Sequence, residues 1–304
     1  MIISASRRTD IPARYPEWFI KRIREQYVLV RNPFNPRQVN RRDLSKNAVD
    51  CIVFWTKNAE PIMAYLDELD EMGYLYYFQF TLTGYGTDLE PNLPGKDKII
   101  DTFISLSQKI GREKVIWRYD PIVLTRQYTV DWHIQTFNNL CEKLLPFTEK
   151  CVISFVDFYE KTKQNTAQIG AKPPTASDIR TMVQEFVKCG LPIETCAEAI
   201  DLSEFGIKRA CCIDPDLIAR ITGRNLHLKK DKSQRKECGC MESKDIGMMD
   251  SCPNGCLYCY ANRNADMARR NARQHNPDSP LLFGEVGAND KIFDPKETGL
   301  LFEE

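Results

Sequence analysis

The sequence feature that most constrains the fold is a regular alternation between short apolar runs and longer amphipathic segments. Strands that read as continuous apolar runs, each followed by a helix, are typical of a parallel sheet covered on both faces. The runs cover residues 1–5, 51–55, 75–82, 114–119, 151–156 and 191–196, with a seventh candidate at 207–213. The sequence therefore predicts an α/β fold: a partial or complete (β/α) barrel of six to seven parallel strands.

Helical patterns fill the intervals between these runs. The last long one carries end signals, because Ser177 is placed as its N-cap and Gly190 lies just beyond its end. The predicted helices cover residues 61–72, 98–110, 131–145 and 177–189, and a further one is expected at 263–274.

Polar and charged residues stand at the ends of the apolar runs, among them Lys57 and Arg118. In a parallel barrel the carboxyl ends of all strands lie on one face, and barrel enzymes build their sites there. We therefore expect this face to form a substrate or cofactor surface. The expected strand exits are residues 6–10, 56–58, 81–84, 118–120, 157–159 and 194–196.

Charge and histidine content narrow the function classes. Lys and Arg number 42 and Asp and Glu number 42, so bulk electrostatics favours neither nucleic acid nor membrane as a partner. The chain has three histidines, which disfavours a His-based metal site or a His-dependent triad.

Cysteine is the informative residue type, with 12 in the chain. The N-terminus lacks the basic region and long apolar stretch of a secretory signal, and no apolar run approaches the roughly 18 residues of a membrane span. We therefore expect a cytoplasmic protein with no membrane partner. In a reducing compartment, clustered cysteines indicate metal binding or catalysis rather than disulfides. Eight of them lie late in the chain: Cys196, Cys211, Cys212, Cys238, Cys240, Cys252, Cys256 and Cys259.

The composition changes after about residue 223. Residues 224–236 are basic and poor in apolar side chains, which indicates an exposed connection. A cysteine-rich stretch follows, and a tail rich in Pro, Gly and Asp begins at residue 276. We predict a (β/α) barrel over residues 1–223 and, over residues 224–304, a cysteine-rich iron–sulfur segment with its tail, packed on the barrel and covering its mouth.

Three cysteines form a C-x₃-C-x₂-C loop, Cys252-Pro-Asn-Gly-Cys256-Leu-Tyr258-Cys259. Thiolates at these spacings suit one cubane iron–sulfur cluster, and Gly255 lets the backbone turn sharply. The loop offers no fourth ligand. An iron without a protein ligand is open to an exogenous chelator, as a catalytic cluster requires.

The loop resembles that of the radical S-adenosylmethionine superfamily, including the aromatic residue before the last cysteine, here Tyr258. The resemblance implies a catalytic [4Fe-4S] cluster on Cys252, Cys256 and Cys259, whose open iron takes the amino and carboxylate groups of S-adenosylmethionine. In that superfamily an electron from the reduced cluster cleaves the cofactor, and the resulting 5′-deoxyadenosyl radical abstracts hydrogen from the substrate. The resemblance also implies a full or partial (β/α) barrel and an electron donor such as a flavodoxin or ferredoxin.

Three strand exits resemble the cofactor-facing segments of spore photoproduct lyase and its relatives: Thr56-Lys57, Thr81-Leu82-Thr83 and Arg118-Tyr119-Asp120-Pro121. This resemblance implies that Lys57 and Arg118 bind the cofactor carboxylate. It also implies that Thr81 or Thr83 binds the ribose hydroxyls.

The whole chain is also similar to an uncharacterised bacterial family described as a domain of unknown function. The similarity includes Phe54-Trp55-Thr56-Lys57-Asn58 and Asp245-Ile246-Gly247. The chain departs from the superfamily pattern in one respect, because its cysteine loop follows the strand–helix array rather than the first strand. The C-terminal segment therefore has to fold back over the barrel mouth.

A second set of four cysteines, Cys196, Cys212, Cys238 and Cys240, remains near the same face. Cys211 and Cys212 are adjacent, and on a strand their side chains point to opposite sides, so one of them serves a given site. The pattern of the uncharacterised family favours Cys212. Four thiolates predict a fully ligated auxiliary [4Fe-4S] cluster, which transfers electrons or binds substrate. A Cys₄ zinc site, or simply buried thiols, is the alternative.

A structural zinc site on Cys238, Cys240 and two loop cysteines is a further alternative, although one residue between Cys238 and Cys240 is fewer than zinc pairs usually show. The alternative function is a non-enzymatic iron–sulfur or zinc module. One such module would be a redox-responsive protein that binds nucleic acid. Its phosphate contacts would come from residues 224–236 and from Arg263, Arg269, Arg270 and Arg273. Such charge runs are more often solvated faces, so the radical enzyme is favoured.

Overall fold

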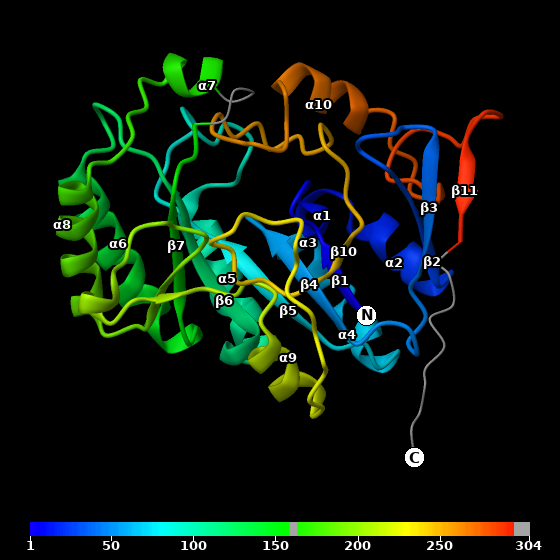
Figure 1. Cartoon of the computed structure of the whole chain (residues 1–304), viewed down its shortest axis with the longest axis horizontal. Helices are drawn as coiled ribbons and strands as arrows, with labels where there is room; N and C mark the ends of the chain where they lie inside the picture. Colours follow the sequence, from blue (N-terminus) through cyan, green and yellow to red (C-terminus); the bar gives the residue numbers. More distant parts are fainter. Residues whose placement is uncertain (159–162, 295–304) are drawn as a thin grey trace.

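The computed structural model describes residues 1–158 and 163–294, and its main element is an eight-stranded, all-parallel sheet (Figure 1). The strand order is β10-β1-β4-β5-β6-β7-β8-β9, with β10 and β9 at the edges, so the sheet is not closed. The strands are β1 (Ile2–Ala5), β4 (Cys51–Thr56), β5 (Tyr76–Thr81), β6 (Val115–Ile122), β7 (Cys151–Phe155), β8 (Ile193–Thr195), β9 (Lys208–Arg209) and β10 (Lys244–Asp245). All seven predicted strands occur in this sheet in chain order, which confirms an α/β fold built on an open parallel sheet.

Side-chain alternation gives the sheet two buried faces. In β4, Ile52 and Phe54 pack into the core of one face, and Cys51 and Val53 into the core of the other. Burial on both sides explains why these strands are apolar throughout rather than alternating.

One face packs against helices through large aromatic side chains. Trp117 of β6 stacks on Phe137 with ring centroids 4.9 Å apart, and Phe137 stacks on Phe186 at 4.0 Å. Burying each such side chain stabilises the fold by about 1.5–3 kcal/mol. The helices of this layer are α1 (Ile11–Arg14), α2 (Pro16–Arg24), α3 (Glu60–Met63), α4 (Leu66–Glu71), α5 (Lys96–Ile110), α6 (Val130–Leu144) and α8 (Ala176–Phe186), with 3-10 turns η1 (Arg112–Lys114), η2 (Leu145–Phe147), η3 (Val187–Cys189) and η4 (Ser203–Phe205) elsewhere.

Two helix predictions need correction. The segment predicted as one helix at 61–72 is interrupted after Met63 and resumes at Leu66. The N-cap of α8 is Thr175 rather than Ser177, because the Thr175 hydroxyl accepts from the Asp178 amide at 3.1 Å and the Asp178 carboxylate accepts from the Thr175 amide at 2.8 Å. This reciprocal capping box satisfies two amides at once, which a cap two residues later would not.

The other face is covered by the C-terminal part of the chain. Leu217 and Ile218 of α9 (Pro215–Thr222) pack there beside Cys212, Cys238 and Cys240. Strand β10, which belongs to the predicted C-terminal segment, pairs with β1 at the start of the chain. The segment beyond residue 223 therefore adds a strand to the main sheet.

The Asp245-Ile246-Gly247 motif fixes this attachment. The Asp245 carboxylate accepts hydrogen bonds from the hydroxyls of Ser4 at 3.0 Å and Ser6 at 2.8 Å. A Cβ on Gly247 would stand 2.1 Å from the Ser6 hydroxyl oxygen, so glycine is required for the close approach. The motif thus holds the first strand exit against the C-terminal segment.

A small second sheet, β11-β3-β2, lies at the end of the molecule away from α8 (Figure 1). It contains β2 (Tyr27–Arg31), β3 (Gln38–Asp43) and β11 (Lys291–Phe293). The sequence analysis missed it, because β3 is polar and only half-buried and so lacks an apolar run. The remaining helices are α7 (Lys163–Gln168) and α10 (Ala265–Ala272), and no helix of the residues described is long and apolar enough to cross a membrane.

Candidate metal centre

A cavity of about 430 Å³ lies at the carboxyl ends of the parallel strands. Residues at the ends of six strands border it: Asp10, Lys57, Thr81, Asp120, Asp157 and Cys196. The expected strand exits therefore share one surface; Tyr159, in one of those exits, lies outside the described residues. All seven cysteines of the two predicted sets border this cavity: Cys196, Cys212, Cys238, Cys240, Cys252, Cys256 and Cys259.

The cysteine loop is held in place by contacts of its backbone and of Asn254. The Leu257 amide donates to the Leu89 carbonyl at 3.0 Å, and the Asn92 side chain donates to the Pro253 carbonyl at 2.8 Å. The Asn254 side chain donates to the Asp10 carboxylate at 3.1 Å. The loop therefore rests on the exits of β1 and β5.

Gly255 occupies a turn that favours glycine. Its φ is +73°, in the left-handed region, and a Cβ there would stand 2.9 Å from the Asn92 side-chain nitrogen. The predicted sharp turn is therefore present, and it brings Cys252 and Cys256 to the same cavity.

Burial disfavours the thiolate form of two loop cysteines, Cys252 and Cys256. Burial raises the pKa of Cys252 to about 12 and holds that of Cys256 well above its ordinary value. The Lys57 ammonium acts in the opposite direction on Cys256. A metal that binds as thiolate complexes would therefore release these protons.

Glu90 is a buried carboxylate that the sequence analysis missed. It accepts from Lys57 at 2.9 Å and from the Thr83 hydroxyl at 3.0 Å, and it also binds Lys96 and the Tyr258 hydroxyl. Burial opposes its charge, but the two ammonium groups outweigh burial and lower its pKa to about 2. A lone Glu in a loop carries no motif, so no local pattern marks this role.

This network changes the surroundings of three expected cofactor residues. Lys57 borders the cavity with its charge already paired to Glu90, and its ammonium lies 5.4 Å from the centre of the Tyr258 ring. Thr83 is buried and does not border the cavity, whereas Thr81 does. Tyr258 connects the cysteine loop to Glu90.

Arg118 is directed to the second cysteine set. Its Nη1 donates to the Cys212 sulfur at 2.8 Å, and its guanidinium forms a buried ion pair with Asp120. The guanidinium carbon also lies 5.2 Å from the centre of the Trp55 ring. The structure therefore places Arg118 beside Cys212, with one carboxylate as its counter-charge.

The second set brings three chain segments together. The sulfurs of Cys196 and Cys212 are 3.6 Å apart, and the Cys240 sulfur accepts from the Ile213 amide at 3.5 Å. Contact with Cys240 lowers the pKa of Cys238 to about 7, and contacts with Cys211 and Cys212 lower that of Cys240 to about 7. Cys238 and Cys240 are thus grouped with Cys196 and Cys212 rather than with the loop.

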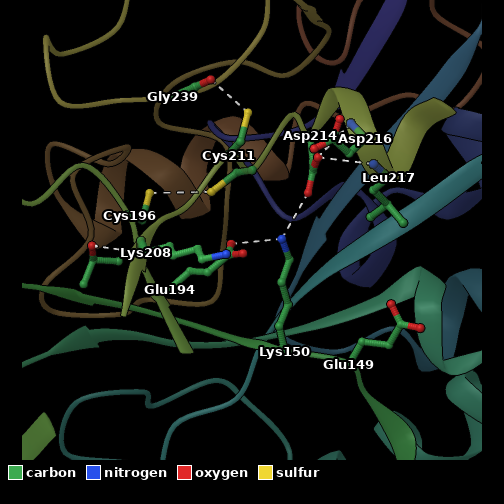
Figure 2. Close-up of polar contacts among 12 residues, drawn as sticks. Glu149, Lys150, Glu194, Cys196, Lys208, Cys211, Asp214, Asp216, Leu217 and Gly239 are labelled. Carbon is green, nitrogen blue, oxygen red and sulfur yellow. Dashed lines mark hydrogen bonds and ion pairs between the residues drawn. The ribbon is translucent and has the colours of Figure 1, made fainter. Parts of the chain in front are cut away.

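The side chains of Cys211 and Cys212 point in different directions. Cys212 borders the cavity, whereas Cys211 donates to the Ile213 carbonyl at 2.8 Å. Cys211 also donates to the Gly239 carbonyl at 2.8 Å (Figure 2). The structure therefore selects Cys212 as the cavity residue, in agreement with the family pattern.

A partly buried lysine, Lys150, fixes the segment that carries Cys212. Lys150 donates to Glu194 at 2.9 Å and to Asp214 at 3.0 Å (Figure 2). The same Asp214 caps α9. The four remaining cysteines do not border the cavity: Cys51, Cys141, Cys151 and Cys189.

The fit of a metal group can be tested on this geometry. Within residues 1–158 and 163–294, no three Cys, His, Asp or Glu side chains stand close enough to hold a single metal ion. A cubane cluster is larger than a single metal ion, so the cysteines that bind it stand further apart from one another. Two observations suit such a group: seven cysteines on one cavity, and a buried Arg7 nitrogen on its wall for which the described residues supply no acceptor.

In the described part of the chain, four of the ten basic side chains proposed for phosphate contacts form ion pairs with acidic residues. Arg224 binds Asp50 at 2.8 Å, and Arg235 binds Asp157 at 2.6 Å. Arg263 and Arg269 also form ion pairs with acidic residues.

These features define an α/β protein whose open parallel sheet carries two cysteine sets on one cavity at its carboxyl edge. The chain belongs to the family described as domain of unknown function (DUF1848), whose model matches residues 2–261. The match includes the strands of the main sheet and all seven cavity cysteines, and it confirms the predicted similarity to such a family. No curated protein and no solved structure shows significant similarity to the chain.

Proposed function

We propose that the protein is a radical S-adenosylmethionine enzyme whose catalytic [4Fe-4S] cluster is held by Cys252, Cys256 and Cys259. The observation that carries this proposal is the position of these thiols, on the same cavity as the ends of six parallel strands. The C-x₃-C-x₂-C spacing and Tyr258 support it. On this proposal the open sheet is the partial (β/α) barrel of that superfamily, and the segment beyond residue 223 covers its mouth.

When bound, the cluster and S-adenosylmethionine would supply reductive cleavage of the cofactor to a 5′-deoxyadenosyl radical. The protein residues supply position and charge. Glu90 ties Tyr258 to the strand exits, and Lys57 keeps a positive charge beside Cys256. Three expected cofactor residues border the cavity and remain in that role: Lys57, Thr81 and Tyr258. Arg118 also borders the cavity, but its guanidinium is bound to Cys212 and Asp120. Thr83 acts through Glu90.

The second cysteine set completes the proposal. Cys196, Cys212, Cys238 and Cys240 would hold a second, fully ligated [4Fe-4S] cluster on the same cavity. The 3.6 Å between the Cys196 and Cys212 sulfurs suits two thiolates on one zinc ion, whereas a cubane would hold these sulfurs further apart, so metal analysis separates the two cases. The proposal includes an electron donor such as a flavodoxin or ferredoxin, which would reduce the cluster. It also includes a cytoplasmic location, where oxygen-sensitive clusters would be protected.

The test is anaerobic reconstitution with iron and sulfide, reduction, and measurement of 5′-deoxyadenosine. We expect release of 5′-deoxyadenosine by the wild-type chain and none by the Cys252→Ala, Cys256→Ala or Cys259→Ala variants. Cys189→Ala is the matched control, because Cys189 does not border the cavity. Cofactor cleavage by the triple alanine variant would show that the loop is not the catalytic site. An iron-loaded wild-type chain that does not cleave the cofactor would instead support the non-enzymatic module.

A further inference from the structure

We infer that Arg7, Trp55 and Arg118 form a cationic wall that raises the reduction potential of an iron–sulfur group on the second cysteine set. The inference rests on the proposed second cluster and goes beyond it, because it assigns these side chains to the control of electron transfer. One electron enters the group from an external protein donor, and the wall stabilises the more negative, reduced form.

The first part of the wall is Arg118. It is buried, and its Nη1 stands 2.8 Å from the Cys212 sulfur. Hydrogen bonds to sulfur ligands and net charge are among the factors that set iron–sulfur potentials. Asp120 balances part of the Arg118 charge from the opposite end of the guanidinium group, through Nε and Nη2.

The second part is Arg7, which follows β1. Its guanidinium carbon lies 5.2 Å from the centre of the Trp55 ring, the same distance as that of Arg118. Trp55 therefore carries two guanidinium groups, each in the range of a cation–π contact. Both arginines and Trp55 border the cavity with the four cysteines.

Arg7 and Trp55 each keep a buried donor without an acceptor. Arg7 Nη2 and Trp55 Nε1 have no hydrogen-bond partner in the described part of the chain. Arg7 Nη1 approaches Asp231 at 3.8 Å, a long ion pair. Leaving such donors buried and unpaired costs about 1–3 kcal/mol each, so an acceptor is expected beside them when the site is complete.

The neighbours of Arg7 indicate which acceptor this is. Arg7 borders the same cavity as Cys212 and Cys240. Arg118 donates to the Cys212 sulfur at 2.8 Å, and that sulfur lies 3.6 Å from the sulfur of Cys196. The two arginines therefore lie beside three of the four cysteines. The sulfur atoms of a cluster bound there would accept hydrogen bonds from the unpaired Arg7 and Trp55 donors.

The test uses the full-length chain in which Cys252, Cys256 and Cys259 are replaced by Ala, so that the second site alone is loaded. The readout is the midpoint potential of the remaining cluster, followed by electron paramagnetic resonance during a reductive titration. Arg7→Gln should lower the ratio of reduced to oxidised cluster about tenfold at a fixed potential, which is about 59 mV for one electron. Arg7→Lys, which keeps the charge, should stay close to the parent.

Arg8→Gln is the matched control. Arg8 is the next residue and borders the same cavity, but it neither packs on Trp55 nor forms an ion pair among the residues described. If Arg7→Gln does not retain iron, Arg118→Gln gives the same measurement with the same expected sign. The inference would be wrong if the parent and Arg7→Gln had equal midpoint potentials, or if Arg8→Gln shifted the potential by the same amount as Arg7→Gln.

Two outcomes separate this inference from the proposed function. A triple alanine variant that holds zinc alone, or no metal, overturns the wall while leaving the loop cluster intact in the wild-type chain. A variant with about four irons and an unshifted potential overturns the wall alone.

Discussion

The loop cysteines and the second cysteine set border one cavity, but they are assembled in different ways. Cys252, Cys256 and Cys259 come from eight consecutive residues, and hydrogen bonds from that stretch to strand exits position them. The second set comes from a strand end, the approach to α9 and a later connection, which are joined by sulfur contacts and by backbone hydrogen bonds such as Met241 N–H to the Ile213 carbonyl at 3.2 Å. A metal on the second set would therefore link more distant parts of the chain than a metal on the loop.

The strongest test of this comparison removes the loop ligands. The Cys252, Cys256 and Cys259 triple alanine variant should lose cofactor cleavage entirely and fall from about eight irons per chain to about four. The expected cause is loss of one cluster while the other stays ligated. Iron analysis and a circular dichroism spectrum check this, and a variant with no iron would mean that the two sites do not load independently.

The second prediction removes one ligand of the other set. Cys238→Ala should lose the second metal group and make the chain beyond residue 223 more sensitive to protease, because that group links this segment to β8. Limited proteolysis with metal analysis measures both effects. Cys189→Ala should change neither, and unchanged protease sensitivity in Cys238→Ala would show that the contacts of β10 suffice.

The third prediction concerns the support of the loop. Glu90→Gln should destabilise the fold by about 3 kcal/mol, because it leaves Lys57 and Lys96, both partly buried, without their counter-charge. Urea unfolding measures this. Glu60→Gln is the control, since the exposed Glu60–Lys98 pair at 2.8 Å should be worth about 0–1 kcal/mol.

The stability of the wild type and of Glu90→Gln should also depend differently on pH. The Glu90 pKa is lowered to about 2, so its stabilising effect is present above the ordinary value near 4.5 and is lost as pH falls towards about 2. The stability difference between wild type and Glu90→Gln should therefore shrink across that window. A difference that is constant from neutral pH to about pH 2 would contradict the charge assignment.

The smallest expected effect is at the turn of the loop. Gly255 and Gly284 have left-handed φ values of +73° and +74°. Replacing either with Ala should therefore lower the free energy of unfolding by about 1–2 kcal/mol. A Cβ at Gly284 meets open space, whereas one at Gly255 approaches Asn92 within 2.9 Å. Gly255→Ala should therefore be the more destabilised in urea and should bind less iron, and equal effects would show that the loop is not tightly held.

The sequence predicted the parts of the molecule that have a local pattern. Strands buried on both faces are continuous apolar runs, so residues such as Cys51 and Phe54 marked β4 in advance. The cysteine loop was equally visible from its spacing. The second sheet was not, because β3 is polar and is stabilised by pairing with β2 and β11 rather than by an apolar face.

The candidate site was predicted in part for the same reason. The sequence pattern predicted that Lys57 and Arg118 lie at strand ends. Their partners Glu90 and Cys212 lie 33 and 94 positions away along the chain. Pairings over such distances leave no local trace. Asp245 is comparable, since its role emerges only when Ser4 and Ser6 are placed beside it.

The pairing of β1 with β10 also sets an order of events during biosynthesis. Ser4 and Asp245 are separated by 241 positions, which a ribosome takes on the order of ten to fifty seconds to traverse. Throughout that interval the first strand has one edge with no neighbour, a state that favours association between nascent chains. The cysteine loop emerges later still. Any cluster on this loop would therefore be inserted only after every strand of the main sheet has been translated.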